Sequence, residues 1–209
     1  MKAYHFLKDD MRSGKGTEPP WTVGEERTYE GDRIALCKSG YHSSPSWRAA
    51  LNYAPGTVAC LVEISKPEQK DKSKQVSQTR RLVAAMNVER EMRLFACDCA
   101  ERALKQERKA GREPDERSWQ AIAVSRLFAQ GKASRDQLII AATAAYAATA
   151  IYVAMAGYAA TAAFAAAAAA PALTASAPAY NVTQKREIAW QKRRLAWYLN
   201  RAFRQAPPL

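Results

Sequence analysis

An uncharged, alanine-rich segment dominates the second half of the chain. No Asp, Glu, Lys or Arg occurs between residues 138 and 182. A larger side chain returns every six residues in this segment, at Ile140, Tyr146, Tyr152, Tyr158 and Phe164. Alanine is the best helix former and proline stops a helix, so the sequence predicts one long helix that ends near Ala170, before Pro171.

That predicted helix has no polar side. A six-residue step turns each aromatic side chain by about 240° from the previous one, which distributes them around the helix axis. A helix that is apolar all round needs burial all round. Three environments provide it: the centre of a helix bundle, a homo-oligomer formed through residues 138–170, or a membrane, for which roughly 20 apolar residues suffice. Alanine is nearly neutral for membrane insertion and the threonines oppose it, so we favour a bundle or self-association.

The charged residues are distributed unevenly over the rest of the chain. The net charge is +12, yet residues 1–64 contain eight basic and eight acidic residues. Residues 65–137 contain 17 basic against 11 acidic residues, and residues 183–209 contain seven against one. Such a surplus attracts polyanions and acidic protein surfaces through a salt-sensitive field, although it also serves solubility.

Neither the N-terminus nor the cysteines indicate secretion or a cofactor. The first residues lack an apolar stretch of signal-peptide length, which predicts a cytoplasmic protein with reduced thiols. The thiols are Cys37, Cys60, Cys97 and Cys99. We predict no metal site, because Cys97 and Cys99 lie about 200° apart on a helix and Cys37 with His42 would need two further ligands. No phosphate-binding glycine loop is present, so no cofactor is predicted.

The first 66 residues have the pattern of a small mixed α/β module. Apolar and alternating runs predict strands at residues 2–7, 21–24, 27–31, 33–37 and 57–64. Between the last two strands, Ser44 followed by Pro45 is typical of a helix start, and Pro55 with Gly56 ends that helix.

The expected fold class is α+β, a small mixed α/β N-terminal module followed by a mostly helical, alanine-rich C-terminal region. We expect an α/β module at residues 1–66, a helical extension at 67–137, the alanine-rich helix and a linker at 138–180, and a basic terminal helix at 181–209. Within the extension, Asp115 is a predicted helix cap, Gly111 and Gly131 are stops, and Ser134 with Gln137 forms a capping box.

The terminal helix, for which Thr183 is the predicted cap, combines basic and aromatic residues. They are Lys185, Arg186, Trp190, Lys192, Arg193, Arg194, Trp197, Arg201 and Arg204. Arginine beside tryptophan at helical spacing can bind phosphates and stack on bases, which makes these residues candidates for binding nucleic acid or an acidic protein. Alternatively, the helix docks on the alanine-rich helix and leaves its basic side in water.

Several stretches resemble a domain family of unknown function found in phage and prophage proteins. They are MKAYHFL, WTVGEERTYEG, LCKSGYHSS, ALNYAPGTVACLVEIS and MRLFACDCAERAL. In that family an alanine-rich helical region and a basic helix such as QKRRLAWYLNRAF commonly follow, so the resemblance covers nearly the whole chain. It implies a phage or prophage origin, and hence the host-cell cytoplasm, but no biochemical activity.

A second resemblance concerns residues 36–65, which are similar to the middle of ADP-ribosyltransferase domains. It implies that Tyr41, Ser43 and Tyr53 line a nicotinamide pocket that takes NAD, and that His5 holds the ribose. His42, in the same turn as Tyr41 and Ser43, is a further pocket candidate.

The chain departs from the ADP-ribosyltransferase pattern at two points. No glycine follows His5, and no strand after Glu63 offers the glutamate that stabilises the transition state in that family. Glu89 and Glu91 fall in a predicted helix instead. We therefore expect binding rather than catalysis from this chain.

Our leading hypothesis is a phage-encoded accessory protein that binds an acidic host partner. The partner would be nucleic acid or a nucleoprotein defence complex, so that the protein counters host defence. The first alternative is a divergent ADP-ribosyltransferase-like enzyme. The second is a structural protein that self-assembles or associates with a membrane.

Overall fold

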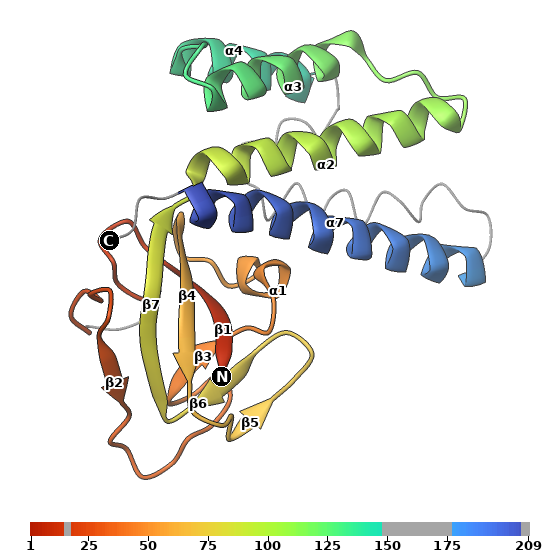
Figure 1. Cartoon of the computed structure of the whole chain (residues 1–209). Coiled ribbons are helices and arrows are strands. Elements are labelled where there is room, and N and C mark those ends of the chain that lie inside the picture. The colour runs from red at the N-terminus through yellow and green to blue at the C-terminus, as the bar shows by residue number, and fades with distance from the viewer. Residues whose placement is uncertain (15–17, 148–176, 206–209) are drawn as a thin grey trace. The chain divides into compact units, whose positions relative to one another are not determined.

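The computed structural model describes residues 1–14, 18–147 and 177–205 (Figure 1). The chain divides into two compact units. The first consists of Met1–Val88 together with Leu199–Leu209, and the second of Glu89–Tyr198. Antiparallel sheets come first along the chain and helices follow, so the predicted α+β fold class is confirmed.

The first unit is built on a four-stranded antiparallel sheet. Its strands lie in the order β1 (Lys2–Leu7), β4 (Val58–Ile64), β7 (Thr79–Asn87) and β2 (Glu26–Thr28), and Figure 1 shows β4 between β1 and β7. The sequence predicted β1 and β4 correctly, because their β-branched and aromatic residues suit a pleated, buried surface.

A second, three-stranded sheet lies beside β1. Its strands are ordered β3 (Tyr41–Ser43), β6 (Gln75–Ser77) and β5 (Gln69–Lys70). Tyr4 of β1 and Ser44 form an isolated bridge with two backbone hydrogen bonds of 3.0 and 2.8 Å. This bridge joins the two sheets at the end of β3.

One face of the four-stranded sheet carries the core of the first unit. Alternate side chains of β1, β4 and β7 point to this face, as expected for extended strands, and Trp21 packs among them. The buried members are Ala3, Leu7, Trp21, Val58, Cys60, Val62, Ile64 and Leu82. Tyr41 packs against this cluster from the second sheet.

The other side of β1 packs against Trp47, the first residue of α1 (Trp47–Leu51). The Trp47 ring centroid lies 4.5 Å from that of Tyr4 and 5.9 Å from that of Phe6. Two residues from the end of the chain join this group. Phe203 stacks on Trp47 at 5.6 Å, and Trp47 Nε1 donates a 3.0 Å hydrogen bond to Asn200 Oδ1. The C-terminal residues therefore complete the packing around α1.

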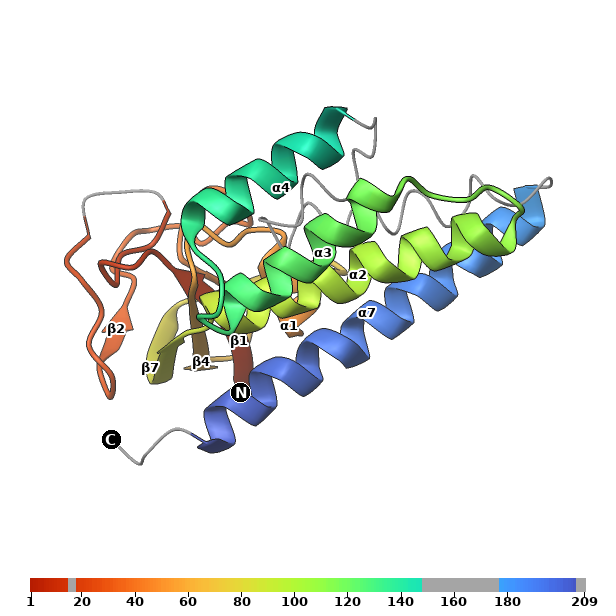
Figure 2. The same cartoon turned by 90° about the horizontal axis from the view of Figure 1, so that it is seen from above.

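The second unit is helical. It contains α2 (Glu89–Lys109), α3 (Glu116–Ala129), α4 (Arg135–Ala147) and α7 (Ala177–Gln205) up to Tyr198. Figures 1 and 2 show α2 lying between α3 and α7. A buried cluster of Cys97, Ala100 and Leu104 from α2 with Ala121 and Ile122 from α3 joins the first two helices.

The predicted caps of this unit are confirmed. Asp115 accepts a 2.9 Å hydrogen bond from a backbone N–H of the first turn of α3. Ser134 and Gln137 bond reciprocally, at 2.8 and 3.2 Å, before α4. Gly111 and Gly131 follow α2 and α3 with φ values of +79° and +70°, which glycine adopts without steric cost.

Strand β7 was missed, and with it the extent of the sheets. The sequence predicted that residues 67–137 form a connector and then helices, but β5, β6 and β7 occupy much of residues 69–87. The adjacent charged residues Arg80 and Arg81 are typical of a solvent-exposed segment rather than of a buried strand. Arg80 is in fact only 3% exposed, because it alternates inward with Leu82.

Two of the short strands predicted near the N-terminus are turns. Residues 21–24 form no strand, and in residues 33–37 only an isolated bridge joins Ala35 to Ser39. The Ser39 hydroxyl accepts the Ala35 N–H at 3.1 Å and donates to the Arg33 carbonyl at 2.6 Å. These local bonds favour a turn, because they satisfy backbone groups that a strand would pair with a neighbour.

The predicted N-caps of α1 and α7 were also wrong. Ser46 caps α1, accepting from Ala49 N at 3.3 Å, whereas Ser44 is engaged in the bridge to β1. Helix α7 begins at Ala177, so Thr183 lies inside the helix rather than at its start.

Most of the predicted long helix lies outside the described residues. Its first part is α4, where Ile139 and Ile140 are 52% and 68% exposed. The homo-oligomer predicted through residues 138–170 stays a prediction. No helix within the described ranges has the length and apolarity to cross a membrane.

Candidate anion-binding groove

Asp98 of α2 holds two arginines that come from different helices. Its Oδ1 accepts a 2.8 Å hydrogen bond from Arg126 Nη1 of α3. Its Oδ2 accepts a 2.6 Å bond from Arg194 Nε of α7 and a 2.8 Å bond from the Tyr198 hydroxyl. Asp98 is only 9% exposed, and charge-assisted hydrogen bonds are stronger than neutral ones. Asp98 therefore fixes both guanidinium groups against α2.

The surroundings keep these groups in one protonation state. Burial acts to lower the pKa of Arg194, but the hydrogen bond and charge of Asp98 outweigh it, so this pKa is raised. Burial, and then the hydrogen bond to Asp98, raise the pKa of Tyr198 to about 12. Arg194 stays charged and Tyr198 stays neutral at physiological pH.

Arg102, one turn of α2 after Asp98, is held by a second buried acid. Its Nε donates a 2.6 Å hydrogen bond to Glu187 Oε2 of α7, and Glu187 is 2% exposed. The Arg102 guanidinium also lies 4.7 Å from the ring centroid of Trp190. Its two Nη atoms have no acceptor among the described residues, and the side chain is 39% exposed. Arg102 is thus positioned, with its outer nitrogens available.

These arginines line one groove of about 650 Å³ on the helical unit. Helix α2 forms most of the wall, α3 contributes Arg126, and α7 contributes Trp190 and Arg194. The cationic side chains that line it are Arg102, Lys105, Arg108, Lys109, Arg126 and Arg194. We call this feature the α2 groove.

Acidic residues offset only part of this positive charge. Asp98 and Glu101 line the α2 groove, and Glu187 and Glu113 pair with groove arginines from outside it. Six positive charges therefore meet four negative ones, which leaves a surplus of two. The hydrogen bond from Lys105 and the charge of Arg126 lower the pKa of Glu101 against the effect of burial, so this carboxylate stays ionised.

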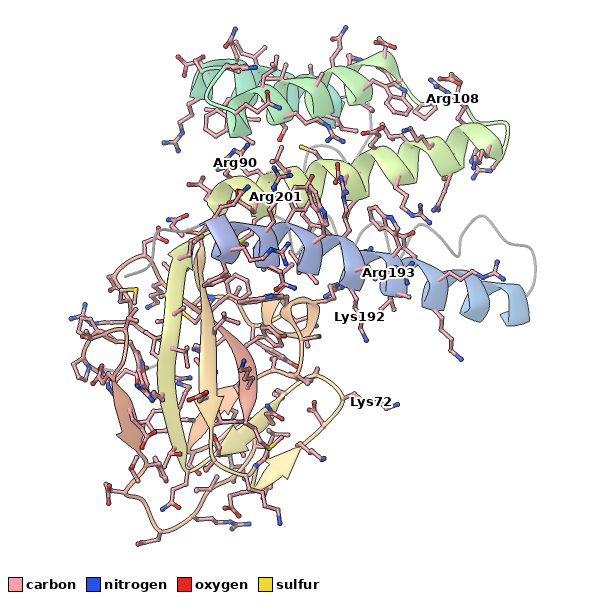
Figure 3. All side chains as sticks on the ribbon, viewed as in Figure 1. Lys72, Arg90, Arg108, Lys192, Arg193 and Arg201 are labelled. Carbon is pink, nitrogen blue, oxygen red and sulfur yellow. The ribbon has the colours of Figure 1, made fainter. Side chains whose placement is uncertain are left out.

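Two cations stand at the outer end of the α2 groove. Lys109 has no ion pair among the described residues. Arg108 pairs with Glu113 and lies 4.7 Å from the centroid of Trp119 of α3. Figure 3 shows Arg108 near the end of α2.

Two of the candidates predicted on the terminal helix, Trp190 and Arg194, lie in the groove. Four others are exposed on α7 outside it, namely Lys185, Arg186, Lys192 and Arg193. In Figure 3 the Lys192 side chain extends on the side of α7 away from α2. Trp197 is 44% exposed, and the exposed Arg201 and Arg204 belong to the part of α7 in the first unit.

Sequence reasoning missed the cations of α2. Arg102, Lys105 and Lys109 follow one another at spacings of three and four residues, which places them on one side of a helix. That signal was present, but the stretch was interpreted only as the basic end of a helix. The contribution of Arg126 had no signal, because only the packing of α3 on α2 brings it there.

The pocket candidates of the first unit lie in three different environments. His5 is partly buried, and its Nε2 atom is covered and has no hydrogen-bond partner among the described residues. Ser43 is 3% exposed and accepts a 3.3 Å bond from Gln75 Nε2. Tyr53 is 49% exposed and shares a 2.8 Å bond with the Ser73 hydroxyl.

Tyr41 and His42 have structural contacts of their own. The Tyr41 ring packs edge-on against Trp21 at 5.5 Å, and the guanidinium of Arg80 lies 5.0 Å from it. His42 Nε2 accepts a 2.8 Å bond from Cys37 N–H, so its Nδ1 carries the proton that faces the Gly40 carbonyl at 3.1 Å. His42 thereby closes the turn that precedes β3.

Arg80 is the buried charge beneath Tyr41. It donates to the His42 carbonyl at 3.0 Å, and its guanidinium lies 4.3 Å from the Trp21 centroid. Burial lowers its pKa to about 10. A second groove of the first unit, about 790 Å³, is lined by Trp21 and Arg81 but by none of the predicted pocket residues.

Comparison with known families concerns this first unit. A DUF7666 domain, a domain of unknown function, covers residues 1–93. Neither the curated proteins nor the solved structures gave a match. The predicted likeness to a domain of unknown function is thereby supported in its coarser form, whereas the phage link and the ADP-ribosyltransferase similarity stay predictions.

The α2 groove lies outside the DUF7666 domain. All its lining residues follow residue 93, from Asp98 onward. Within the described ranges, no three His, Cys, Asp or Glu side chains group as a metal site would require. The α2 groove is therefore the candidate site, and its chemistry is that of arginine, lysine and tryptophan side chains.

Proposed function

We propose that this chain binds nucleic acid through the α2 groove. The observation that carries the proposal is Arg102, whose guanidinium is held by Glu187 and Trp190 while both Nη atoms lack a protein acceptor among the described residues. A planar fork of this kind matches phosphate oxygens. Lys109, which has no ion pair among the described residues, supplies further positive charge in the same groove, whereas Arg126 and Arg194 are paired with Asp98 and Glu101.

The ion pairs inside the groove support binding rather than cancel it. They hold long side chains in place, so less conformational entropy is lost when a ligand arrives. A surplus of two positive charges remains around the groove, and the whole chain carries +12. Phosphate backbones are attracted by such a surplus and release counterions on binding.

Nucleic acid fits the groove better than an acidic protein does. Both would be attracted by lysine and arginine, but the groove also contains the Arg102–Trp190 stack. Nucleic acids offer planar bases for such a surface, whereas acidic side chains do not. The test below distinguishes nucleic acid from an acidic protein partner.

The test is fluorescence anisotropy of a labelled oligonucleotide at several salt concentrations. We expect affinity to fall steeply between about 50 and 200 mM salt. Lys109→Gln should reduce the salt slope by about 1, because one phosphate contact is lost. Lys109 suits this purpose because its replacement breaks no ion pair among the described residues.

Two matched variants control for charge. Lys72→Gln makes the same change on an exposed lysine of the first unit, labelled in Figure 3, and should leave the slope unchanged. Lys192→Gln tests the outer side of α7, where the sequence predicted the contact. If Lys109→Gln behaves like Lys72→Gln, the α2 groove is not the binding site.

The control ligand is poly-glutamate. Binding of poly-glutamate that depends on Lys109, without binding of the oligonucleotide, would identify an acidic protein as the partner and contradict the proposal. Salt-independent oligonucleotide binding would contradict it as well.

We further propose a phage origin and a role against host defence. They rest on the sequence resemblance, and they would make the bound nucleic acid part of a host defence complex in the host cytoplasm. Recovery of nucleic acid with the tagged chain from expressing bacteria, reduced by Lys109→Gln, is the expected result. The NAD-binding enzyme stays an alternative that rests on resemblance alone.

A further inference from the structure

The α2 groove combines charge with a stacking surface. Arg102 lies over Trp190 at 4.7 Å, and one edge of the guanidinium is tied to Glu187. The Arg102 side chain is 39% exposed, and its Nη atoms have no acceptor among the described residues. A flat group can stack on this plane, because arginine guanidinium groups pair face to face with nucleobases.

The groove is a hollow between helices rather than a protruding helix. Arg126 and Arg194 are held by Asp98, which is only 9% exposed, and Arg126 also pairs with Glu101, so these ion pairs lie toward the floor. Within the described ranges, the unpaired positive charge of the groove is carried by Lys109 and by the Nη side of Arg102. Duplex DNA is usually read by an element that enters its major groove. A groove with a surplus of basic residues and an aromatic wall is instead typical of proteins that bind single strands.

From these two features we infer that the α2 groove binds single-stranded nucleic acid, with one base stacked on the Arg102–Trp190 pair and the adjacent phosphates on the Nη atoms of Arg102 and on Lys109. This inference rests on the proposed function and adds the strand form and the base contact to it. The base adds affinity by stacking, and sequence preference is weak because every base has a flat face.

The test uses two single-stranded probes with equal charge. One is a labelled thymidine 12-mer, and the other is a 12-mer of the same backbone without bases. The wild-type chain should bind the thymidine strand at least about fivefold more tightly, the effect expected of one stacked base. A 12-base-pair duplex should bind more weakly than the thymidine strand.

Two variants locate the base contact. Trp190→Ala should lower affinity for the thymidine strand at least about fivefold and change binding of the base-free strand by less than about twofold. Arg102→Lys keeps the charge but removes both the plane and the paired Nη contact to phosphate, so it should weaken binding of the thymidine strand clearly more than binding of the base-free strand. This second variant keeps the test valid if Trp190→Ala fails to fold.

The outcomes separate this inference from the proposed function. Equal affinity for the two single-stranded probes, or equal effects of Arg102→Lys on both, would overturn base stacking and leave phosphate binding intact. Tighter binding of the duplex would overturn the strand preference. Absence of binding to any probe would overturn the proposed function itself.

Discussion

A 2.6 Å hydrogen bond joins Arg194 Nε to Asp98 Oδ2, across 96 residues of sequence. It connects α7 to the middle of α2, and Arg126 of α3 reaches the same carboxylate. Three helices therefore meet at one buried charge.

Replacing Asp98 should destabilise the helical unit. Asp98→Asn keeps the size of the side chain but removes the charge that Arg126 and Arg194 face. Hydrogen bonds to charged groups contribute about 1.5–3 kcal/mol, so we expect the free energy of unfolding to fall by that amount in urea titrations. Glu113→Gln, which breaks an exposed pair with Arg108, should cost less than about 1 kcal/mol. Equal effects of the two variants would show that Asp98 has no special role.

The stability of the first unit should decrease in mild acid because of His5. Burial first, and then the charges of Arg80 and His42, lower the pKa of His5 well below 6.5. The folded chain keeps His5 neutral, whereas the unfolded chain binds a proton as the pH falls through about 6.5. The unfolded state then holds more protons, so the free energy of unfolding decreases, by at most about 1.4 kcal/mol at pH 5.5 relative to pH 7.5.

The control for this prediction is His5→Gln. The chain has only two histidines, and His42 is present in both proteins, so the difference between their pH dependences reports His5. Urea titrations at pH 7.5, 6.5 and 5.5 measure it. A variant that loses stability as steeply as the wild type over this range would show that His5 is not responsible.

Phe203 should contribute to the stability of the first unit from the far end of the chain. It stacks on Trp47 at 5.6 Å, and such aromatic pairs contribute about 0.5–1.5 kcal/mol beyond the area they bury. We expect Phe203→Ala to lower the free energy of unfolding by about 1–2 kcal/mol. Arg204→Ala, an exposed neighbour on α7, should change it by less than about 0.5 kcal/mol. No difference between these variants would argue against the contact.

Gly40 should be less replaceable than Gly111, although both have positive φ angles of +88° and +79°. A Cβ at position 40 would lie 2.8 Å from a methyl carbon of Val76 and 2.9 Å from one of Ile34, whereas position 111 has nothing within 4 Å. We expect Gly111→Ala to cost about 1 kcal/mol for backbone strain alone. Gly40→Ala should cost clearly more, measured by thermal unfolding, and equal costs would contradict the crowding at position 40.

The fold was predictable where side-chain pattern and local chemistry agree. Strands β1 and β4 are apolar runs between turn residues, and the caps at Asp115 and Ser134 act within a few residues of themselves. Strand β7 was missed because its inward-facing Arg80 broke the apolar pattern. Only tertiary structure shows that the rings of Trp21 and Tyr41 and the His42 carbonyl lie against that charge.

The candidate site was predictable in part for the same reason. Trp190 and Arg194 were identified from arginine and tryptophan at helical spacing on α7. The other side of the groove depends on which helix α7 contacts, and the sequence favoured the alanine-rich segment rather than α2. The buried partners Asp98 and Glu187 establish that contact, and a single carboxylate in a charged helix does not reveal its partner in advance.

Trp47 and Asn200 are 153 residues apart, and this separation affects how the chain folds during synthesis. At about 5–20 residues per second, a ribosome needs roughly 8–30 s to advance from one to the other. During that interval the strands of the first unit have been made, but Asn200 and Phe203 have not. Trp47, only 2% exposed in the finished fold, then lacks two of its partners, so its ring is less covered than in the finished fold. The first unit therefore acquires its final packing only after Asn200 and Phe203 have been synthesised.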